Sequence, residues 1–209
     1  MSWVKQQQFA LQEALAICFA AQRINGSYVK HTQRFSTEGN PTIHANKDMV
    51  KQHFGRYTDP DFVNFKAIDE DFEAVDIATK HFKRYTLGLI GDTLSAFQQD
   101  VFKLLSSETI AFNKLGLLAY VPELVKREVA ESKFKKMLRM EYRNSANIGN
   151  VKDPVEGVIK FLSKFWSEDW ESFNYVADLN GHLVSFMNKF DHDIGSRKRI
   201  KGKVKAHGK

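Results

Sequence analysis

The densest set of residues that could do chemistry lies near the C-terminus, where seven Lys or Arg and no acidic residue occur between positions 197 and 209. Guanidinium and ammonium groups bind phosphate through charge-assisted hydrogen bonds. A localised cluster of this kind therefore predicts a polyanionic partner, and nucleic acid above all. The candidate phosphate ligands are Arg197, Lys198, Arg199, Lys201, Lys203 and Lys205, together with Lys160 and Lys164 upstream.

The cations at 199, 201, 203 and 205 alternate with Ile200, Gly202, Val204 and Ala206. A period of two indicates a half-buried β-strand. Such a strand would place its cations on one face, about 7 Å apart. The alternative is an edge strand whose lysines only prevent aggregation, and alternation alone does not separate the two.

Four aromatic residues between positions 166 and 175 could stack on bases, at about 1–3 kcal/mol each. These candidates are Trp166, Trp170, Phe173 and Tyr175. Phe173 and Tyr175 share one strand parity, so the alternative for them is a place in a hydrophobic core. Trp170 lies in a polar loop and is the better exposed candidate.

The elements that must position these residues are four predicted strands. The first carries Val155, Gly157, Ile159, Phe161 and Phe165 on one parity; Glu156, Lys160 and Lys164 take the other, and Val158 and Leu162 break the pattern. Gly157 could mark a bend or bulge. A second strand follows, then the hairpin signal Asn180-Gly181, a return strand over 182–188, a turn at 191–195 and the basic strand. This order suits the first four strands of a five-stranded barrel.

Two segments resemble the opening and the late strand of a family of oligonucleotide-binding (OB-like) domains found at the C-termini of tailed-phage proteins. They are residues 148–156 and 200–208. The resemblance implies an OB-like antiparallel barrel over 148–209 that binds single-stranded DNA in phage-type replication, recombination or repair. In that family the chain continues beyond the turn matching Ala206-His207-Gly208 into a last strand. This sequence stops at Lys209, so we expect either a shortened chain or an open, incomplete barrel.

Residues 1–143 predict a mainly helical domain, and residues 144–147 predict a linker. Expected helices cover 3–23, 46–54, a region opened by Asp59-Pro60, a segment capped by Asp92, 106–115, and a charged stretch from Pro122 onward. The most regular apolar stripe is Ile68, Phe72, Val75, Ala78, Phe82, Tyr85 and Leu89. Residues 28–44 allow a basic β-hairpin, although an ordinary solvated excursion is the favoured interpretation.

Composition bounds the class of protein. A hydrophobic content of 43% with 17 phenylalanines is globular, and no apolar run approaches the roughly 20 residues of a membrane span. The single cysteine, Cys18, predicts a buried thiol and a reducing cytoplasm, which would be the host's if a phage encodes the protein.

The sequence offers no motif of its own for catalysis or for cofactor binding. The sequence lacks Gly-x-Gly-x-x-Gly, P-loop, His-x3-His and cysteine-rich zinc patterns. Asp191-His192-Asp193 is explained by a tight turn, and Asp69-Glu70-Asp71 by a helix start. We therefore expect no enzyme activity, no cofactor and no metal site, while a nuclease built from distant carboxylates is the remaining alternative.

The sequence predicts an α+β protein that binds nucleic acid, with single-stranded DNA as the expected ligand. A structural or adaptor protein is the main alternative, acting through its helical domain by contact with a protein partner or by self-association. Salt separates the two, because phosphate binding weakens steeply with log[salt]. An apolar protein interface does not.

Overall fold

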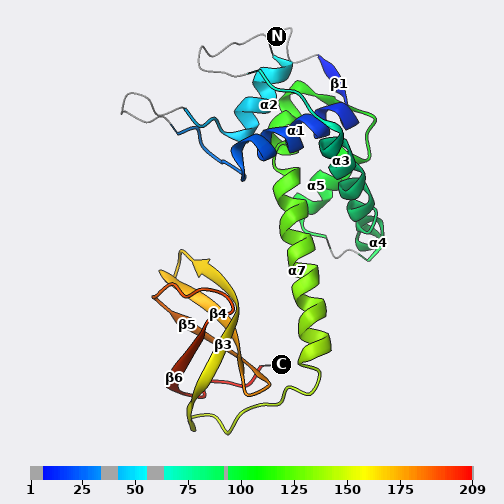
Figure 1. Ribbon diagram of the computed structural model, residues 1–209. Coiled ribbons are helices and arrows are strands. Elements are labelled where there is room, and N and C mark those ends of the chain that lie inside the picture. The colour runs from blue at the N-terminus through cyan, green and yellow to red at the C-terminus, as the bar shows by residue number, and fades with distance from the viewer. Residues whose placement is uncertain (1–6, 34–41, 56–63, 92–93, 209) are drawn as a thin grey trace. The chain divides into compact units, whose positions relative to one another are not determined.

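The computed structural model describes residues 7–33, 42–55, 64–91 and 94–208. Contacts divide the chain into two compact units, Met1–Ala130 and Glu131–Lys209. We call them the helical unit and the sheet unit (Figure 1). Helices dominate the first unit, which also holds a two-stranded antiparallel sheet, and a four-stranded antiparallel sheet forms most of the second, which confirms the predicted α+β class.

The helical unit packs its helices around α1 (Leu11–Asn25). The other elements are α2 (Asn46–Phe54), α3 (Asp69–Phe82), α4 (Tyr85–Ile90), α5 (Ala96–Leu105), the 3₁₀ turn η2 (Phe112–Lys114), α6 (Leu115–Leu118), the first half of α7 (Val121–Glu141), and the paired strands β1 (Gln8–Ala10) and β2 (Thr109–Ala111). Ala14, Ala16, Ala20 and Ala21 are fully buried in α1. These short side chains let neighbouring helices approach α1 closely.

The N-terminal helix is shorter than predicted. Residues 8–10 form β1 instead, because they pair with Thr109–Ala111, a partner about a hundred residues away that local pattern does not reveal. The end of α1 was predicted correctly. Gly26 follows it with φ of +71°, a left-handed conformation that glycine adopts without strain.

The predicted strands of the 28–44 hairpin are absent from the described part of this segment, where a single bridge joins Gln33 to Ile43. Asn46 binds both polar groups of the Val29 backbone: its Oδ1 accepts from Val29 N–H at 2.8 Å, and its own N–H donates to Val29 C=O at 3.0 Å. Those groups are therefore not available to a strand partner. The hairpin tip, residues 34–41, lies outside the described residues.

Helix boundaries between 59 and 116 differ from the prediction at three places. The long stripe is interrupted after Phe82, and α4 begins at Tyr85. Ser95 caps α5 in a reciprocal pair with Gln98, while Asp59-Pro60 and Asp92 lie outside the described residues. Residues 109–111 form β2 rather than helix, because β1 supplies their hydrogen-bond partners.

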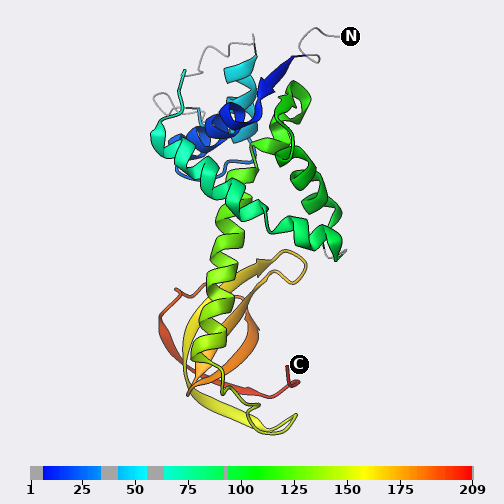
Figure 2. The ribbon, with the colours of Figure 1, turned by 90° about the vertical axis from the view of Figure 1, so that its right-hand side faces the viewer.

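The sheet unit holds four antiparallel strands in the spatial order β5-β4-β3-β6. They are β3 (Pro154–Ser167), β4 (Ser172–Leu179), β5 (His182–Asn188) and β6 (Arg197–Lys203). Three strands joined in succession, with the fourth beside the first, make a Greek key, and Figure 2 shows the curvature of the sheet. Asn180 and Gly181 have φ of +54° and +85°, as the predicted hairpin turn requires.

The Greek key is open within the described residues, because β5 and β6 are its two edges and do not pair with each other. Its core comprises Ile159, Phe161, Tyr175, Ala177 and Leu179. Two backbone hydrogen bonds of Phe161 help to fix the connection from β5 to β6 to the sheet. Phe161 N–H donates to Ser196 C=O at 3.0 Å, and Gly195 N–H donates to Phe161 C=O at 2.8 Å.

Candidate nucleic-acid interface

The register between β3 and β6 decides where the basic residues point. Lys160 pairs with Arg197, Val158 with Arg199, Glu156 with Lys201, and Pro154 with Lys203. Directly opposite residues of an antiparallel pair project to the same side of the sheet. Five cations therefore share the face turned away from the core, and we call them the outer cation row: Lys160, Arg197, Arg199, Lys201 and Lys203.

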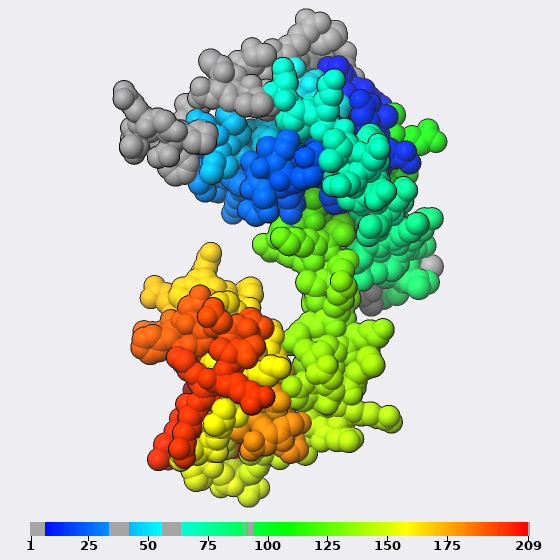
Figure 3. All heavy atoms as spheres, viewed as in Figure 1, coloured from blue at the N-terminus to red at the C-terminus, as the bar shows by residue number. Residues whose placement is uncertain are grey.

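All five cations are exposed; Glu156 lies among them, and Asp178 of β4 lies directly opposite Lys160 at one end. Glu156 contacts Arg199 at 2.8 Å and Lys201 at 3.8 Å. The side chains of Arg199 and Lys201 remain 75% and 83% exposed, so these ion pairs are weak. The row keeps a clear excess of positive charge, and Figure 3 shows the C-terminal strand, in red, at the surface of the sheet unit.

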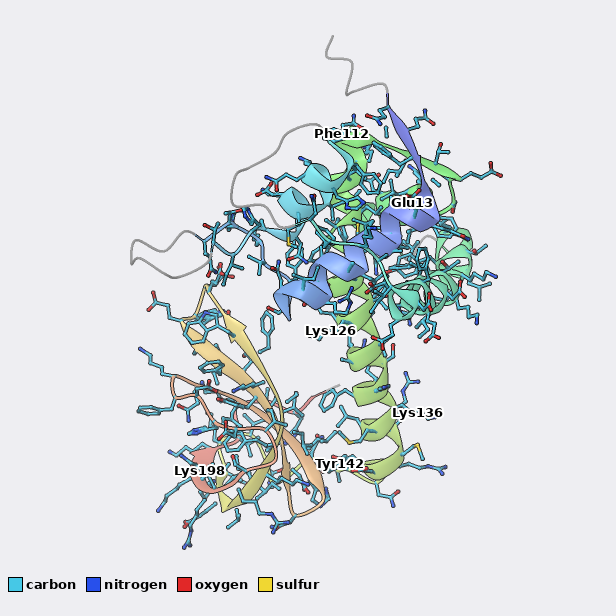
Figure 4. All side chains as sticks on the ribbon, turned by 45° about the horizontal axis from the view of Figure 1, so that its top comes forward. Glu13, Phe112, Lys126, Lys136, Tyr142 and Lys198 are labelled. Atoms are coloured by element: carbon cyan, nitrogen blue, oxygen red, sulfur yellow. The ribbon has the colours of Figure 1, made fainter. Side chains whose placement is uncertain are left out.

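Lys198 and Lys205 lie outside this row. Lys198 pairs with Ile159 and so lies on the opposite face of the sheet from the row. Lys205 follows the end of β6 and is exposed. The predicted cluster of six C-terminal cations is thus divided: four of them stand together on β6, and Figure 4 labels Lys198 on the same strand.

A β-bulge at Leu162 reverses the sequence assignment of the distal half of β3. The register with β4 shifts between Phe161 and Ser163, so Phe165 opposes Asn174 and Lys164 opposes Tyr175. Phe165, predicted to share the core parity, is instead 70% exposed on the outer face. An extra residue moves every following side chain to the other face. Gly157, where a bulge was considered, pairs regularly with Ile200.

The same bulge places Lys164 on the core side of the sheet. Its Nζ lies 2.5 Å from Asp191 and 5.7 Å from the ring centroid of Phe173. The hydrogen bond to Asp191 raises the pKa of Lys164. Lys164 therefore neutralises Asp191 beside the 191–195 turn and does not extend the outer cation row.

The four predicted stacking residues have different environments. Trp170 is 70% exposed in the turn between β3 and β4, and Trp166 is 43% exposed with its ring 4.8 Å from that of Phe173. Tyr175 is buried at 1% exposure; its hydroxyl accepts from His192 N–H at 2.8 Å and donates to Phe190 C=O at 2.9 Å. Tyr175 is therefore a core residue, whereas Trp166 and Trp170 keep surface that a base could cover.

A shallow pocket of about 240 Å³ lies at one end of the outer cation row. It is lined by Val158, Ile159, Lys160, Asp178, Asn180 and Arg197. The Asp178 carboxylate already accepts from Gly181 N–H at 2.7 Å and hydrogen-bonds Tyr142, just after α7. Burial raises the pKa of Tyr142, and the contact with Asp178 raises it further. Asp178 is thus engaged by its own hydrogen-bond partners, and the pocket's cations, Lys160 and Arg197, are available to bind an anion.

Glu128 in the helical unit forms a cluster that sequence reasoning missed. Its carboxylate accepts from Arg84 at 2.5 Å, from Gln98 at 3.4 Å and from the Tyr85 hydroxyl, and lies 2.7 Å from His81 Nε2. Burial raises the pKa of Glu128, but these hydrogen bonds outweigh it and lower the pKa overall. Burial and the Glu128 contact raise the pKa of Tyr85. Tyr85 is 3% exposed, so we interpret the cluster as structural.

The acidic motif at the start of α3 also has a structural role. Asp71 accepts from Arg23 at 2.8 and 3.1 Å and from Ile68 N–H at 3.0 Å, which joins α1 to the start of α3. In the part of the chain that the structure describes, His, Cys, Asp and Glu nowhere gather in a group of three that could hold a metal ion. None of the described helices is long and apolar enough to cross a membrane.

Comparison with known proteins found no match to any protein-family model, to any curated protein or to any solved structure. The function of the chain must therefore be inferred from the geometry of the sheet unit.

Proposed function

We propose that the sheet unit binds single-stranded nucleic acid, DNA in the first instance, on its outer face. One observation carries this proposal: the β3–β6 register gathers five cations on a single exposed face. Phosphate contacts supply most of the affinity of sequence-independent binders. Phe165, exposed on the same face, and Trp170 in the adjoining turn are candidates to stack bases.

Topology supports the further proposal that this sheet is an open OB-like domain. OB domains are partly open five-stranded Greek-key barrels, and β3 to β6 have the Greek-key order with a long, bulged first strand. A role in phage-type replication, recombination or repair, in the host cytoplasm, follows from the sequence resemblance alone.

Fluorescence anisotropy with a labelled 20-nucleotide single strand and its duplex, over a salt series, tests the proposal. We expect the single strand to bind with a steep negative slope of log K against log[salt]. Lys201→Glu/Lys203→Glu should abolish most of this binding. The control Lys133→Glu/Lys136→Glu changes the net charge equally on exposed α7 positions of the same unit (Figure 4). Equal losses in both variants, or no binding at low salt, would contradict the proposal.

A second candidate function, an adaptor acting through the helical unit, is favoured by large apolar side chains exposed there. Leu87 in α4 is 75% exposed and Ile77 in α3 is 59% exposed. Either a protein partner or a second copy of the chain could cover them. Light scattering on wild type and Ile77→Ser/Leu87→Ser tests self-association, which should persist at high salt if these residues form the contact.

A further inference from the structure

We infer that the nucleic acid runs along β6 as an extended single strand, with one phosphate at each outer-face cation of the strand and with Glu156 occupying the third phosphate position, at Lys201, in the free protein. This inference rests on the proposed function and specifies the conformation of the ligand and the residue that competes with it. It concerns Arg197, Arg199, Lys201 and Lys203 of the outer cation row, which belong to one strand.

The spacing of these cations fits an extended phosphodiester chain. Alternate residues of a strand are about 7 Å apart. An extended peptide advances about 1.1–1.2 Å per backbone bond, because three bonds span 3.3–3.6 Å. Six bonds separate successive phosphates of a nucleic acid, so its extended repeat is also about 7 Å on the same reasoning. Four cations can therefore contact four successive phosphates.

The same geometry disfavours a duplex. Duplex DNA carries a charge every 1.7 Å of its axis, roughly, so a cation patch without order should bind it at least as well as a single strand. Phosphates on one strand of a duplex lie on a helical path around a cylinder, whereas a flexible single strand can straighten along β6. Tighter binding of the single strand than of the duplex would therefore indicate that the alignment of the cations, and not the net charge alone, determines binding.

Glu156 lies where the third phosphate from Arg197 would bind. It is directly opposite Lys201 across the strand pair and contacts both Arg199 and Lys201. Its side chain is 43% exposed, and its carboxylate presents to these two cations the kind of acceptor that a phosphate would present. A bound strand must displace this carboxylate or bind beside it, so Glu156 lowers the affinity of the row.

The decisive variant moves one cation to the other face without changing the charge. Lys201→Gly/Gly202→Lys transfers the ammonium to position 202, which pairs with Val155 on the core side, where a Cβ meets nothing within 4 Å. With a labelled 20-nucleotide oligothymidylate, we expect a weaker complex and a salt slope reduced by about 0.7, the value for one phosphate contact on a single strand. Circular dichroism and thermal unfolding would verify the fold.

Glu156→Gln supplies the second arm and keeps the shape of the side chain. We expect affinity for the oligothymidylate to rise about two- to fivefold, the range of a weak surface ion pair. If wild type binds the oligothymidylate but neither variant changes the affinity or the slope, the inference is overturned and the proposed function survives. If wild type fails to bind at low salt, the proposed function itself fails.

Discussion

In the helical unit acidic and basic side chains pair with each other across elements, whereas in the sheet unit cations stand side by side on one exposed face. Residues 1–130 carry 15 Lys or Arg and 15 Asp or Glu, while residues 131–209 carry 16 and 10. All of the formal charge of +6 therefore belongs to the sheet unit. In the helical unit, then, paired charges stabilise the packing of the helices. In the sheet unit, the cations of the outer cation row are available to a ligand.

The largest expected effect tests the buried charge cluster around Glu128 in the helical unit. Glu128→Ala should lower the free energy of unfolding by about 3 kcal/mol, because it leaves buried donors without their acceptor. Chemical denaturation measures this loss, and nucleic-acid binding should be unchanged. Glu131→Ala is the matched control: Glu131 is 60% exposed and pairs with Lys135 across one helical turn, so its loss should cost less than about 0.5 kcal/mol. Similar losses in both variants would contradict the role given to Glu128.

A somewhat smaller effect distinguishes the packed and open parts of the sheet unit. An ideal Cβ on Gly157 would lie 2.6 Å from Leu179 Cδ1, whereas one on Gly202 meets nothing within 4 Å. Gly157→Ala should therefore destabilise the protein by about 1–3 kcal/mol through overpacking. Gly202→Ala should be close to neutral, and thermal unfolding of the two variants provides the comparison.

The pH dependence of stability sharpens the contrast further. The pKa of Glu128 is lowered in the folded state, and an unfolded glutamate titrates near pH ~4.3. Its stabilisation is therefore complete above about pH 5 and is lost as pH falls through the folded pKa, at no more than about 1.4 kcal/mol per pH unit. Denaturation between pH 6 and 3 should show a shallower slope for Glu128→Gln than for wild type. If the two proteins lose unfolding free energy with pH at the same rate, other carboxyl groups are responsible for the acid sensitivity.

The smallest expected effect concerns the outer face. Phe165→Ser should weaken single-strand binding by about 1 kcal/mol, roughly fivefold, if the ring stacks on a base. Stability should change little, because Phe165 is 70% exposed. Anisotropy titration and thermal unfolding of the same sample separate the two effects. A large loss of stability with unchanged affinity would instead place Phe165 in the packing of the sheet.

The sequence predicted correctly those features that depend on neighbouring residues alone, such as turns, helix ends and the alternation of a strand. The left-handed Gly26 and the Asn180-Gly181 turn were found because their backbone conformations restrict residue choice. The alternation of β6 likewise placed Arg199, Lys201 and Lys203 on one face. The burial of Tyr175 was weighed as an alternative from its strand parity.

Features that depend on distant partners were not predictable in this way. Strand β1 needs β2, and the donors to Glu128 come from three other segments. The reversal of Phe165 depends on one extra residue in β3. Leu162, which interrupted the polar pattern of its parity, was the only trace of that bulge in the sequence.

The bulge at Leu162 also bears on how this protein can change in evolution. Substitutions along β3 alter one side chain at a time, but deletion of residue 162 would exchange the two faces of residues 163–167 in a single step. Phe165 would turn toward the core, and Trp166 would turn outward. Among descendants of this sequence, the length of β3 should therefore be inherited more strictly than the identities of its exposed residues.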